Sequence, residues 1–201
     1  MHVAAAARPR ATLVLGHGAG GGVETADLQA LARALPSEGV TVVRVEQPWR
    51  VAGRKVAAPP PTLDRAWLAV VPALDVQGPL LVGGRSAGAR VACRTAVPLG
   101  AVGCLALAFP LHPPGSVGRS RLGELTGAGL PTLVVQGGRD PFGTPDDFPA
   151  SLPVGTVVRA VPHADHSFRV AKAAPLTAQE AVGLVVDHTR RWLRGLLGRV
   201  A

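Results

Sequence analysis

A serine between two glycines stands directly after an apolar stretch of this chain. Residues 84–88 read Gly-Arg-Ser-Ala-Gly, and residues 80–82 just before them are Leu-Leu-Val. A sharp turn from a strand into a helix strains its central residue, and glycines two positions before and after leave the room that such a turn needs. The pattern therefore predicts that Ser86 lies at the tip of a strand–turn–helix, with its hydroxyl exposed above the sheet.

Serine becomes a nucleophile at neutral pH only when a base takes its proton, and that base is usually an imidazole held by a carboxylate. Both groups occur further along the chain, each after its own apolar run. Asp140 lies in a glycine-rich turn, and His163 and His166 follow the next run. Parallel strands end at one edge of a sheet, so we expect Ser86, Asp140 and one histidine to meet there and perform acyl transfer.

The choice among neighbouring candidates stays open on chemistry alone. His163 competes with His166 as the base, and Asp165 could orient an imidazole ring in place of Asp140. Asp146 and Asp147 are further carboxylates, for which we favour a solvated loop position. Asp140 is better placed because its glycine-rich turn directly follows a predicted strand.

Acyl transfer also needs backbone N–H groups that stabilise the oxyanion of the tetrahedral intermediate. One donor is expected to be the N–H of Ala87, directly after the nucleophile. The second should come from residues 17–22, His-Gly-Ala-Gly-Gly-Gly, which follow an early apolar run. Ala19 is our first choice and Gly18 the next, because small residues let the main chain approach a substrate.

Several side chains near these segments are candidates for a substrate pocket. His17 and Gly18 belong to the glycine-rich loop, and Arg85 and Arg90 flank the serine. Either arginine could bind a substrate carboxylate or form an ion pair within the protein. We favour the ion pair or a surface position for Arg90 and leave Arg85 open.

The glycine-rich loop also permits a different interpretation. Residues 16–21 match the dinucleotide-binding pattern G-x-G-x-x-G, and Glu46, at the end of the next predicted strand, could bind a ribose. This interpretation leaves the second glycine turn at Ser86 unexplained, and gives no reason for Asp140 and His166 at successive strand ends. We therefore place it behind acyl transfer.

Apolar runs alternate with helical patterns along the whole chain, which predicts one α/β domain over residues 1–201. Most runs are continuously apolar, as in a parallel sheet covered on both faces. We expect strands at Ala11–Leu15, Thr41–Val45, Leu80–Val82, Cys104–Phe109, Thr132–Val135 and Thr156–Val161. We expect helices at Leu28–Leu35, Leu63–Leu74, Ala87–Val97 and Gly118–Leu125, and a last one from a capping box at Thr177–Glu180. Gln47–Pro61 and His112–Gly115 are expected to be irregular, as pocket walls or surface connections.

Composition excludes several classes of protein. Apolar residues make up 47% of the 201 residues, as in a globular protein. The net charge is +8, but the arginines are scattered and accompany few aromatic residues, so we expect no nucleic-acid partner. No stretch approaches the roughly 20 apolar residues of a membrane helix, and residues 1–10 lack a signal peptide's apolar segment. We therefore expect no membrane partner and a cytoplasmic protein, with Cys93 and Cys104 as buried free thiols.

Together these segments resemble the α/β-hydrolase superfamily, and more narrowly its small dienelactone-hydrolase-related members without a large cap. The resemblance rests on residues 17–21, 83–90, 109–115, 136–143 and 165–168. It implies Ser86 as nucleophile, Asp140 as acid and His166, rather than His163, as base. It also implies an α/β-hydrolase fold with a mostly parallel sheet of about six strands, helices on both faces and no large cap domain.

The resemblance implies a hydrolase that cleaves small esters or related acyl compounds through an acyl-enzyme, with no metal or organic cofactor. Dienelactone hydrolases proper use cysteine as nucleophile, so their substrate is not carried over. Some relatives in this branch look like subunits of protein complexes. A non-catalytic scaffold with the same fold is therefore the alternative function, followed by the dinucleotide-binding protein.

Overall fold

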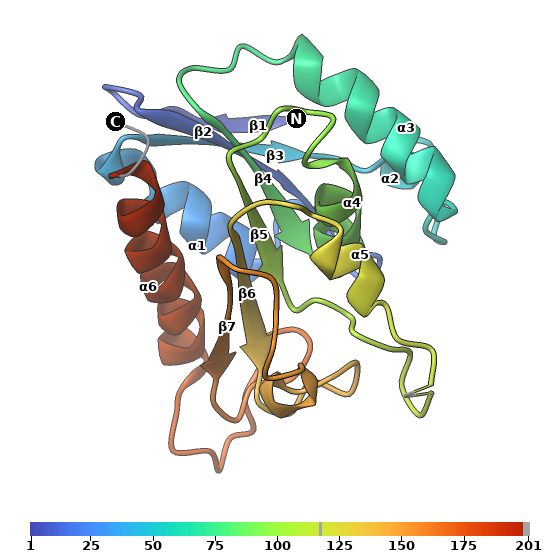
Figure 1. Cartoon of the computed structure of the whole chain (residues 1–201). Coiled ribbons are helices and arrows are strands. Elements are labelled where there is room, and N and C mark those ends of the chain that lie inside the picture. The colour runs from blue at the N-terminus through green and yellow to red at the C-terminus, as the bar shows by residue number, and fades with distance from the viewer. Residues whose placement is uncertain (117, 199–201) are drawn as a thin grey trace.

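The computed structural model describes residues 1–116 and 118–198 and contains one central β-sheet (Figure 1). The sheet has seven strands in the order β1-β3-β2-β4-β5-β6-β7. The strands are β1 (His2–Ala4), β2 (Ala11–Gly16), β3 (Val40–Val45), β4 (Leu80–Arg85), β5 (Gly103–Leu107), β6 (Thr132–Gly137) and β7 (Thr156–Val161). Strands β2 to β7 all run parallel, which confirms the predicted mostly parallel sheet.

Strand β1 is an additional, antiparallel strand that the sequence did not predict. It pairs with β3 so that His2 lies opposite Arg44 and Ala4 opposite Val42. Its three residues are mostly exposed and form no apolar run, so neither length nor hydrophobic pattern marked it. It covers the sheet edge that β3 would otherwise present to solvent.

Helices cover both faces of the sheet, as predicted. Helices α1 and α6 pack together on one face, and α3, α4 and α5 pack on the other (Figure 1). The helices are α1 (Ala26–Ala34), α2 (Pro48–Val51), α3 (Pro60–Val70), α4 (Ala87–Thr95), α5 (Leu122–Thr126) and α6 (Ala178–Leu197). Within the described ranges, no connection between strands is long enough to form a separate cap domain.

The core forms on both sides of the sheet because its central strands are apolar on both faces. Strands β2, β5 and β6 are buried at every position. On one side Leu13 and Leu105 pack against Leu31 of α1 and Leu193 of α6.

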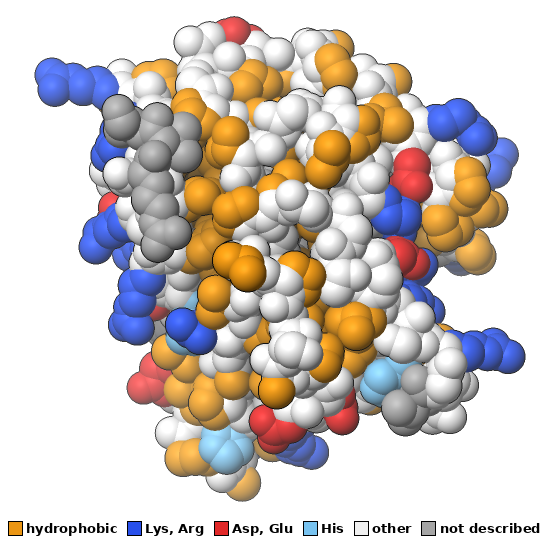
Figure 2. Space-filling model, in the orientation of Figure 1, with side chains coloured by type: hydrophobic (Ala, Val, Ile, Leu, Met, Phe, Trp, Pro, Cys, Tyr) orange, Lys and Arg blue, Asp and Glu red, His pale blue; other side chains and the backbone are white. Residues whose placement is uncertain are grey.

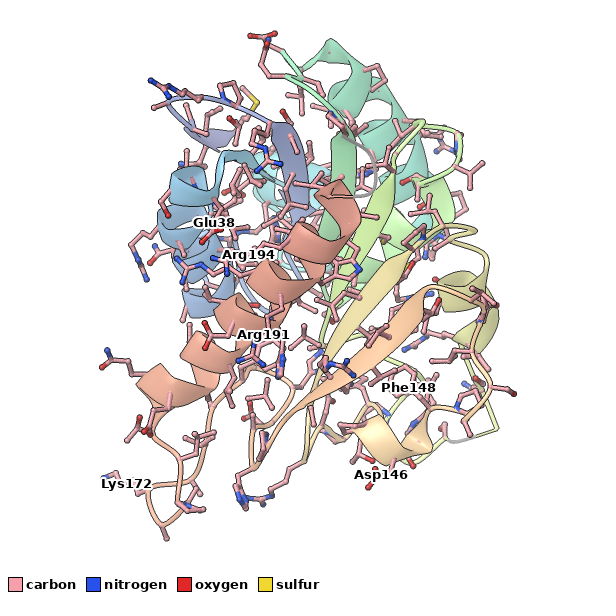
Figure 3. All side chains as sticks on the ribbon, turned by 60° about the vertical axis from the view of Figure 1, so that its left-hand side comes forward. Glu38, Asp146, Phe148, Lys172, Arg191 and Arg194 are labelled. Carbon is pink, nitrogen blue, oxygen red and sulfur yellow. The ribbon has the colours of Figure 1, made fainter. Side chains whose placement is uncertain are left out.

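Helix α6 begins with the predicted capping box of Thr177. Near its other end, an ion pair of 2.8 Å between Arg194 and Glu38 ties the helix to the 3-10 turn Pro36–Glu38 (Figure 3).

Segment 47–61, expected to be irregular, is partly helical. It contains α2, and the proline run at its end forms the first turn of α3. Proline suits that position because its φ matches the helix and its missing N–H would have no intrahelical acceptor there. The helix expected to end at Leu74 stops at Val70 and continues as a 3-10 turn to Ala73.

Cys93 and Cys104 are buried free thiols, as expected. Among the residues that the structure describes, none of the helices combines the length and apolar character needed to span a membrane. Figure 2 shows one face of the molecule, on which Lys and Arg side chains project at separate places around the outline.

Candidate active site

Ser86 lies in the sharp turn between β4 and α4 with a φ of 52°, in the left-handed region that a non-glycine residue rarely adopts. Its backbone N–H bonds to the carbonyl of Leu107 over 2.9 Å, which ties the turn to β5. Gly84 and Gly88 are required because the end of β2 packs against both. A Cβ on Gly84 would lie 2.7 Å from the carbonyl carbon of Gly88, and a Cβ on Gly88 would overlap Gly16.

The structure brings together three of the predicted side chains from the ends of three strands. Nε2 of His166 lies 2.9 Å from Oγ of Ser86. On the other side of the ring, Nδ1 of His166 lies 2.7 Å from Oδ2 of Asp140. The histidine side chain is 18% exposed and the carboxylate is fully buried, so the chain of hydrogen bonds runs from the surface into the protein.

Asp140 is held by two further donors that the sequence did not point to. Oδ1 accepts the backbone N–H of Phe142 over 2.8 Å, and Oδ2 accepts a side-chain N–H of Gln136 over 3.0 Å. The Phe142 ring lies 4.3 Å, centre to centre, from the imidazole of His166. A carboxylate only accepts hydrogen bonds, so these donors fix both its position and the ring orientation. Gln136 belongs to the motif at residues 136–143, but the sequence pattern did not show that its side chain is buried near the end of β6 and can therefore reach Asp140.

The other histidine and carboxylates that the sequence offered for the base and its partner lie in turns or stabilise them. His163 is exposed, with a φ of 60°, in the turn after β7. Oδ1 of Asp165 accepts the backbone N–H groups of Ser167 and Arg169. Asp147 caps the short 3-10 turn that begins after Thr144. The geometry thus assigns the contact with Ser86 to His166.

The glycine-rich loop after β2 passes against the serine. A Cβ on Gly18 would lie 3.2 Å from Cβ of Ser86. Nδ1 of His17 bonds to the carbonyl oxygen of Gly18 over 2.8 Å. That carbonyl and the N–H of Ala19 belong to one planar trans peptide, so the N–H of Ala19 points away from the His17 ring. The N–H of Ala87 lies at the first position of α4, where backbone N–H groups have no intrahelical acceptor.

His17 does not line a substrate pocket, which corrects the expectation for this residue. Its side chain is fully buried, and Nε2 accepts the backbone N–H of Gln47 over 2.9 Å. Burial lowers the pKa of His17 and outweighs the hydrogen bond to Gly18. The neutral ring therefore bridges two loops, and Trp49 packs edge-on against it at 5.2 Å.

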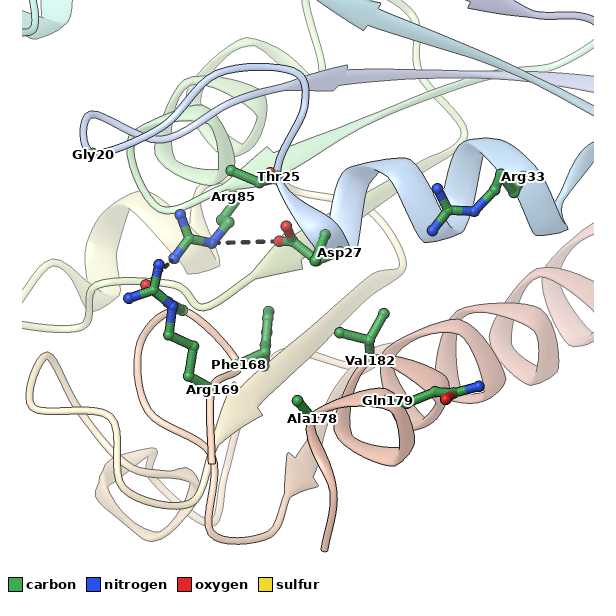
Figure 4. A pocket seen from close by; sticks show the side chains of 12 residues that line it. Gly20, Thr25, Asp27, Arg33, Arg85, Phe168, Arg169, Ala178, Gln179 and Val182 are labelled. Carbon is green, nitrogen blue, oxygen red and sulfur yellow. Dashed lines mark hydrogen bonds and ion pairs between the residues drawn. The ribbon is translucent and has the colours of Figure 1, made fainter. Parts of the chain in front are cut away.

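Arg85 lines a pocket of about 450 Å³, but its guanidinium contacts other protein groups, the carbonyl of His166 among them. Its Nε lies 3.4 Å from Oδ2 of Asp27 in the first turn of α1 (Figure 4). Arg90 forms an ion pair with Glu124, the arrangement favoured from the sequence. The pocket runs between the N-terminal ends of α1 and α6, and Gly20 forms part of its wall.

The dinucleotide interpretation fits the structure less well. Helix α1 begins at Ala26, so the glycine pattern at 16–21 does not lead directly into a helix N-terminus. The order of the strands also differs from that of a dinucleotide-binding sheet, in which the first parallel strand lies between the second and the fourth. Here β2, the first parallel strand, lies between β3 and β4, the second and the third. Glu46 lies 3.6 Å from the buried ring of His17.

Comparisons with known proteins agree with this architecture. The family described as "Alpha/beta hydrolase domain" matches residues 9–194. An alpha-beta serine hydrolase homologue from Coxiella burnetii has a TM-score of 0.70 at 19% identity, over 94% of this chain and 89% of that chain. The protein XC6422 from Xanthomonas campestris, described as an a/b serine hydrolase without lid, has a TM-score of 0.63 at 22% identity, over 94% and 87%.

A dienelactone hydrolase from Anabaena variabilis is similar at a TM-score of 0.70 and 17% identity, over 96% of this chain and 89% of that chain. A search of curated proteins found no match. The predicted fold and its resemblance to small hydrolases without a large cap are thus confirmed. Since the family match covers nearly the whole chain, the chain belongs to the alpha/beta hydrolase domain family.

Proposed function

We propose that this protein is a serine hydrolase that cleaves small esters or related acyl compounds. The observation that carries the proposal is the continuous chain of hydrogen bonds from Oγ of Ser86 through His166 to the buried carboxylate of Asp140. It gives the serine a base within reach of its proton and gives the base a fixed orientation. Both are needed for nucleophilic catalysis by a hydroxyl group.

In the proposed reaction, Nε2 of His166 takes the proton of Ser86 as Oγ attacks the carbonyl carbon of the substrate. The N–H groups of Ala19 and Ala87 stabilise the oxyanion of the tetrahedral intermediate. His166 then gives its proton to the leaving group, and the acyl group remains on Ser86. A water molecule, deprotonated by His166, releases the acid and restores the serine. Asp140 stabilises the imidazolium that forms in both halves of the reaction.

A small acyl substrate fits the surroundings of the serine. The part of the chain that the structure describes has no separate cap domain over this edge of the sheet. A pocket of about 450 Å³ is bordered by Arg85 and Ser167, the neighbours of the proposed nucleophile and base. Ligand pockets of this size suit small organic molecules.

The proposal is tested by labelling with a fluorophosphonate probe and by a panel of nitrophenyl esters of increasing acyl length. We expect the probe to modify Ser86 and at least one short ester to be hydrolysed. Ser86→Ala is the blank for both assays, and labelling or turnover that persists in this variant would contradict the assignment. A folded protein without labelling or turnover would instead favour the non-catalytic scaffold.

A further inference from the structure

Arg85 directly precedes Ser86 in the chain, but its side chain extends into the protein and is 6% exposed. Nη2 of Arg85 donates to the backbone carbonyl of His166 over 2.7 Å and to Oγ of Ser167 over 3.0 Å. One nitrogen atom thus holds the backbone of the proposed base and the side chain of the next residue. These contacts join segments 81 residues apart in the sequence.

The same guanidinium reaches two other parts of the site. Its Nε forms the ion pair with Asp27 (Figure 4). The carboxylate of Asp27 is in the first turn of α1, and the residue is only 2% exposed. Nη1 of Arg85 faces the glycine-rich loop, since a Cβ on Gly18 would lie 3.4 Å from that atom. The planar, rigid donor array of arginine suits contacts in several fixed directions.

The loop that carries His166 needs such support. His163 and Phe168 adopt left-handed conformations, with φ of 60° and 54°, on the two sides of the histidine. Non-glycine residues hold such conformations only where the surrounding structure enforces them. Phe168 is anchored in the core at 1% exposure, whereas the backbone of His166 is anchored by Arg85.

We propose that Arg85 is a positioning residue that sets the distance between the base and the nucleophile. It is the last residue of β4, directly before Ser86, and its guanidinium holds the carbonyl of His166 and packs against Gly18. The proposal rests on the proposed function of Ser86 and His166. The rival role, binding of a substrate carboxylate, would require the guanidinium to release Asp27 or the His166 loop.

The first test measures how fast a fluorophosphonate probe modifies Ser86 in Arg85→Ala. A displacement of the base by about 1 Å costs about 10²-fold in rate. We therefore expect the maximal labelling rate to fall by about that factor, with little change in the half-saturating probe concentration. Arg65→Ala is the matched control, because Arg65 is an exposed arginine on α3 outside this pocket, and its side chain bonds only to Thr62 in the described residues. Its labelling should equal that of the unaltered protein.

Replacement with a smaller donor separates positioning from folding. Removal of the Arg85 side chain leaves a space continuous with the pocket of about 450 Å³, which a guanidinium ion can enter. Added guanidinium chloride, well below denaturing concentrations, should restore part of the rate in Arg85→Ala and none in Ser86→Ala. Arg85→Lys keeps the charge beside Asp27 with fewer directed donors, and should lose about tenfold, as expected for one charge-assisted hydrogen bond.

Hydrogen exchange of residues 162–170 provides a readout that needs no turnover. We expect faster exchange of this segment in Arg85→Ala and no change in Arg65→Ala. Normal exchange together with normal labelling would overturn the proposal. So would a defect confined to the half-saturating concentration, since that outcome assigns Arg85 to ligand binding. If the unaltered protein is not labelled at Ser86, the proposed function fails, and exchange still decides whether Arg85 holds the loop.

Discussion

Gln136 donates a hydrogen bond from Nε2 to Oδ2 of Asp140 over 3.0 Å, and the same oxygen accepts the N–H of His166. Nε2 of Gln136 also lies 2.6 Å from the carbonyl oxygen of Gly143, so it closes the turn in which the aspartate sits. Gln136, in β6, therefore orients the carboxylate of Asp140 independently of the contact between that carboxylate and the imidazole.

Asp140→Asn should lower the maximal rate of acyl transfer by about 10³- to 10⁴-fold. The carboxylate accepts from Gln136 and His166 on one oxygen and from the N–H of Phe142 on the other. An amide in its place turns an NH₂ group toward one of these donors, whichever way it rotates. Steady-state kinetics on the best ester of the panel measures the loss. Asp146→Asn, an exposed change nearby, is the control; equal activity of the two variants would contradict the role of Asp140.

Glu124→Gln should lower the free energy of unfolding by about 1–2 kcal/mol, because Arg90 and Arg94 both bond to this half-buried carboxylate. Burial raises the pKa of Glu124, but the two arginines outweigh it and lower the pKa overall. The ionised form is therefore favoured by folding, and this contribution should be lost as the pH falls below 4.5. Urea unfolding measures both effects. Glu24→Gln, which affects an exposed contact of 3.9 Å with Arg50, should change little.

His17 should make the protein less stable in mild acid. Burial lowers its pKa below the ordinary value of 6.5, so the unfolded chain binds a proton that the folded protein does not. Stability then falls as the pH drops below 6.5, by at most about 1.4 kcal/mol per pH unit and per group. The pKa of His188 is lowered in the same direction, also by burial. His17→Asn and His188→Asn should each flatten this dependence in urea titrations, and an unchanged slope in His17→Asn would contradict a lowered pKa of this ring in the folded protein.

Two glycine substitutions should act in opposite directions. Gly183 lies within α6, and a Cβ there would meet nothing within 4 Å, so Gly183→Ala should stabilise the protein by about 1 kcal/mol through helix propensity. This should raise the melting temperature by about 2–4 °C. Gly84→Ala should destabilise by about 3 kcal/mol, because its Cβ would collide with the backbone of Gly88 and Gly16. Thermal unfolding of both variants measures the contrast, and a neutral Gly84→Ala would contradict the packed turn.

The sequence alone determined the class of the fold and the residues that are candidates for its chemistry. Continuous apolar runs specify strands buried on both faces, and glycines at 84 and 88 specify a turn with Ser86 at its tip. These are local properties of composition and spacing. Strand β1 escaped prediction because three exposed residues carry no such pattern, and they become a strand only by pairing with β3.

The tertiary structure decided which groups meet. Chemistry alone does not choose between His163 and His166, and the resemblance that favours His166 gives no contact. The loop conformation is what brings Nε2 of His166 to 2.9 Å from Oγ of Ser86. The role of Arg85 likewise depends on Asp27 and the His166 carbonyl, which are remote in sequence. Such contacts arise when strands and loops pack around one edge of the sheet. The spacing of residues along the chain therefore does not predict which groups become partners.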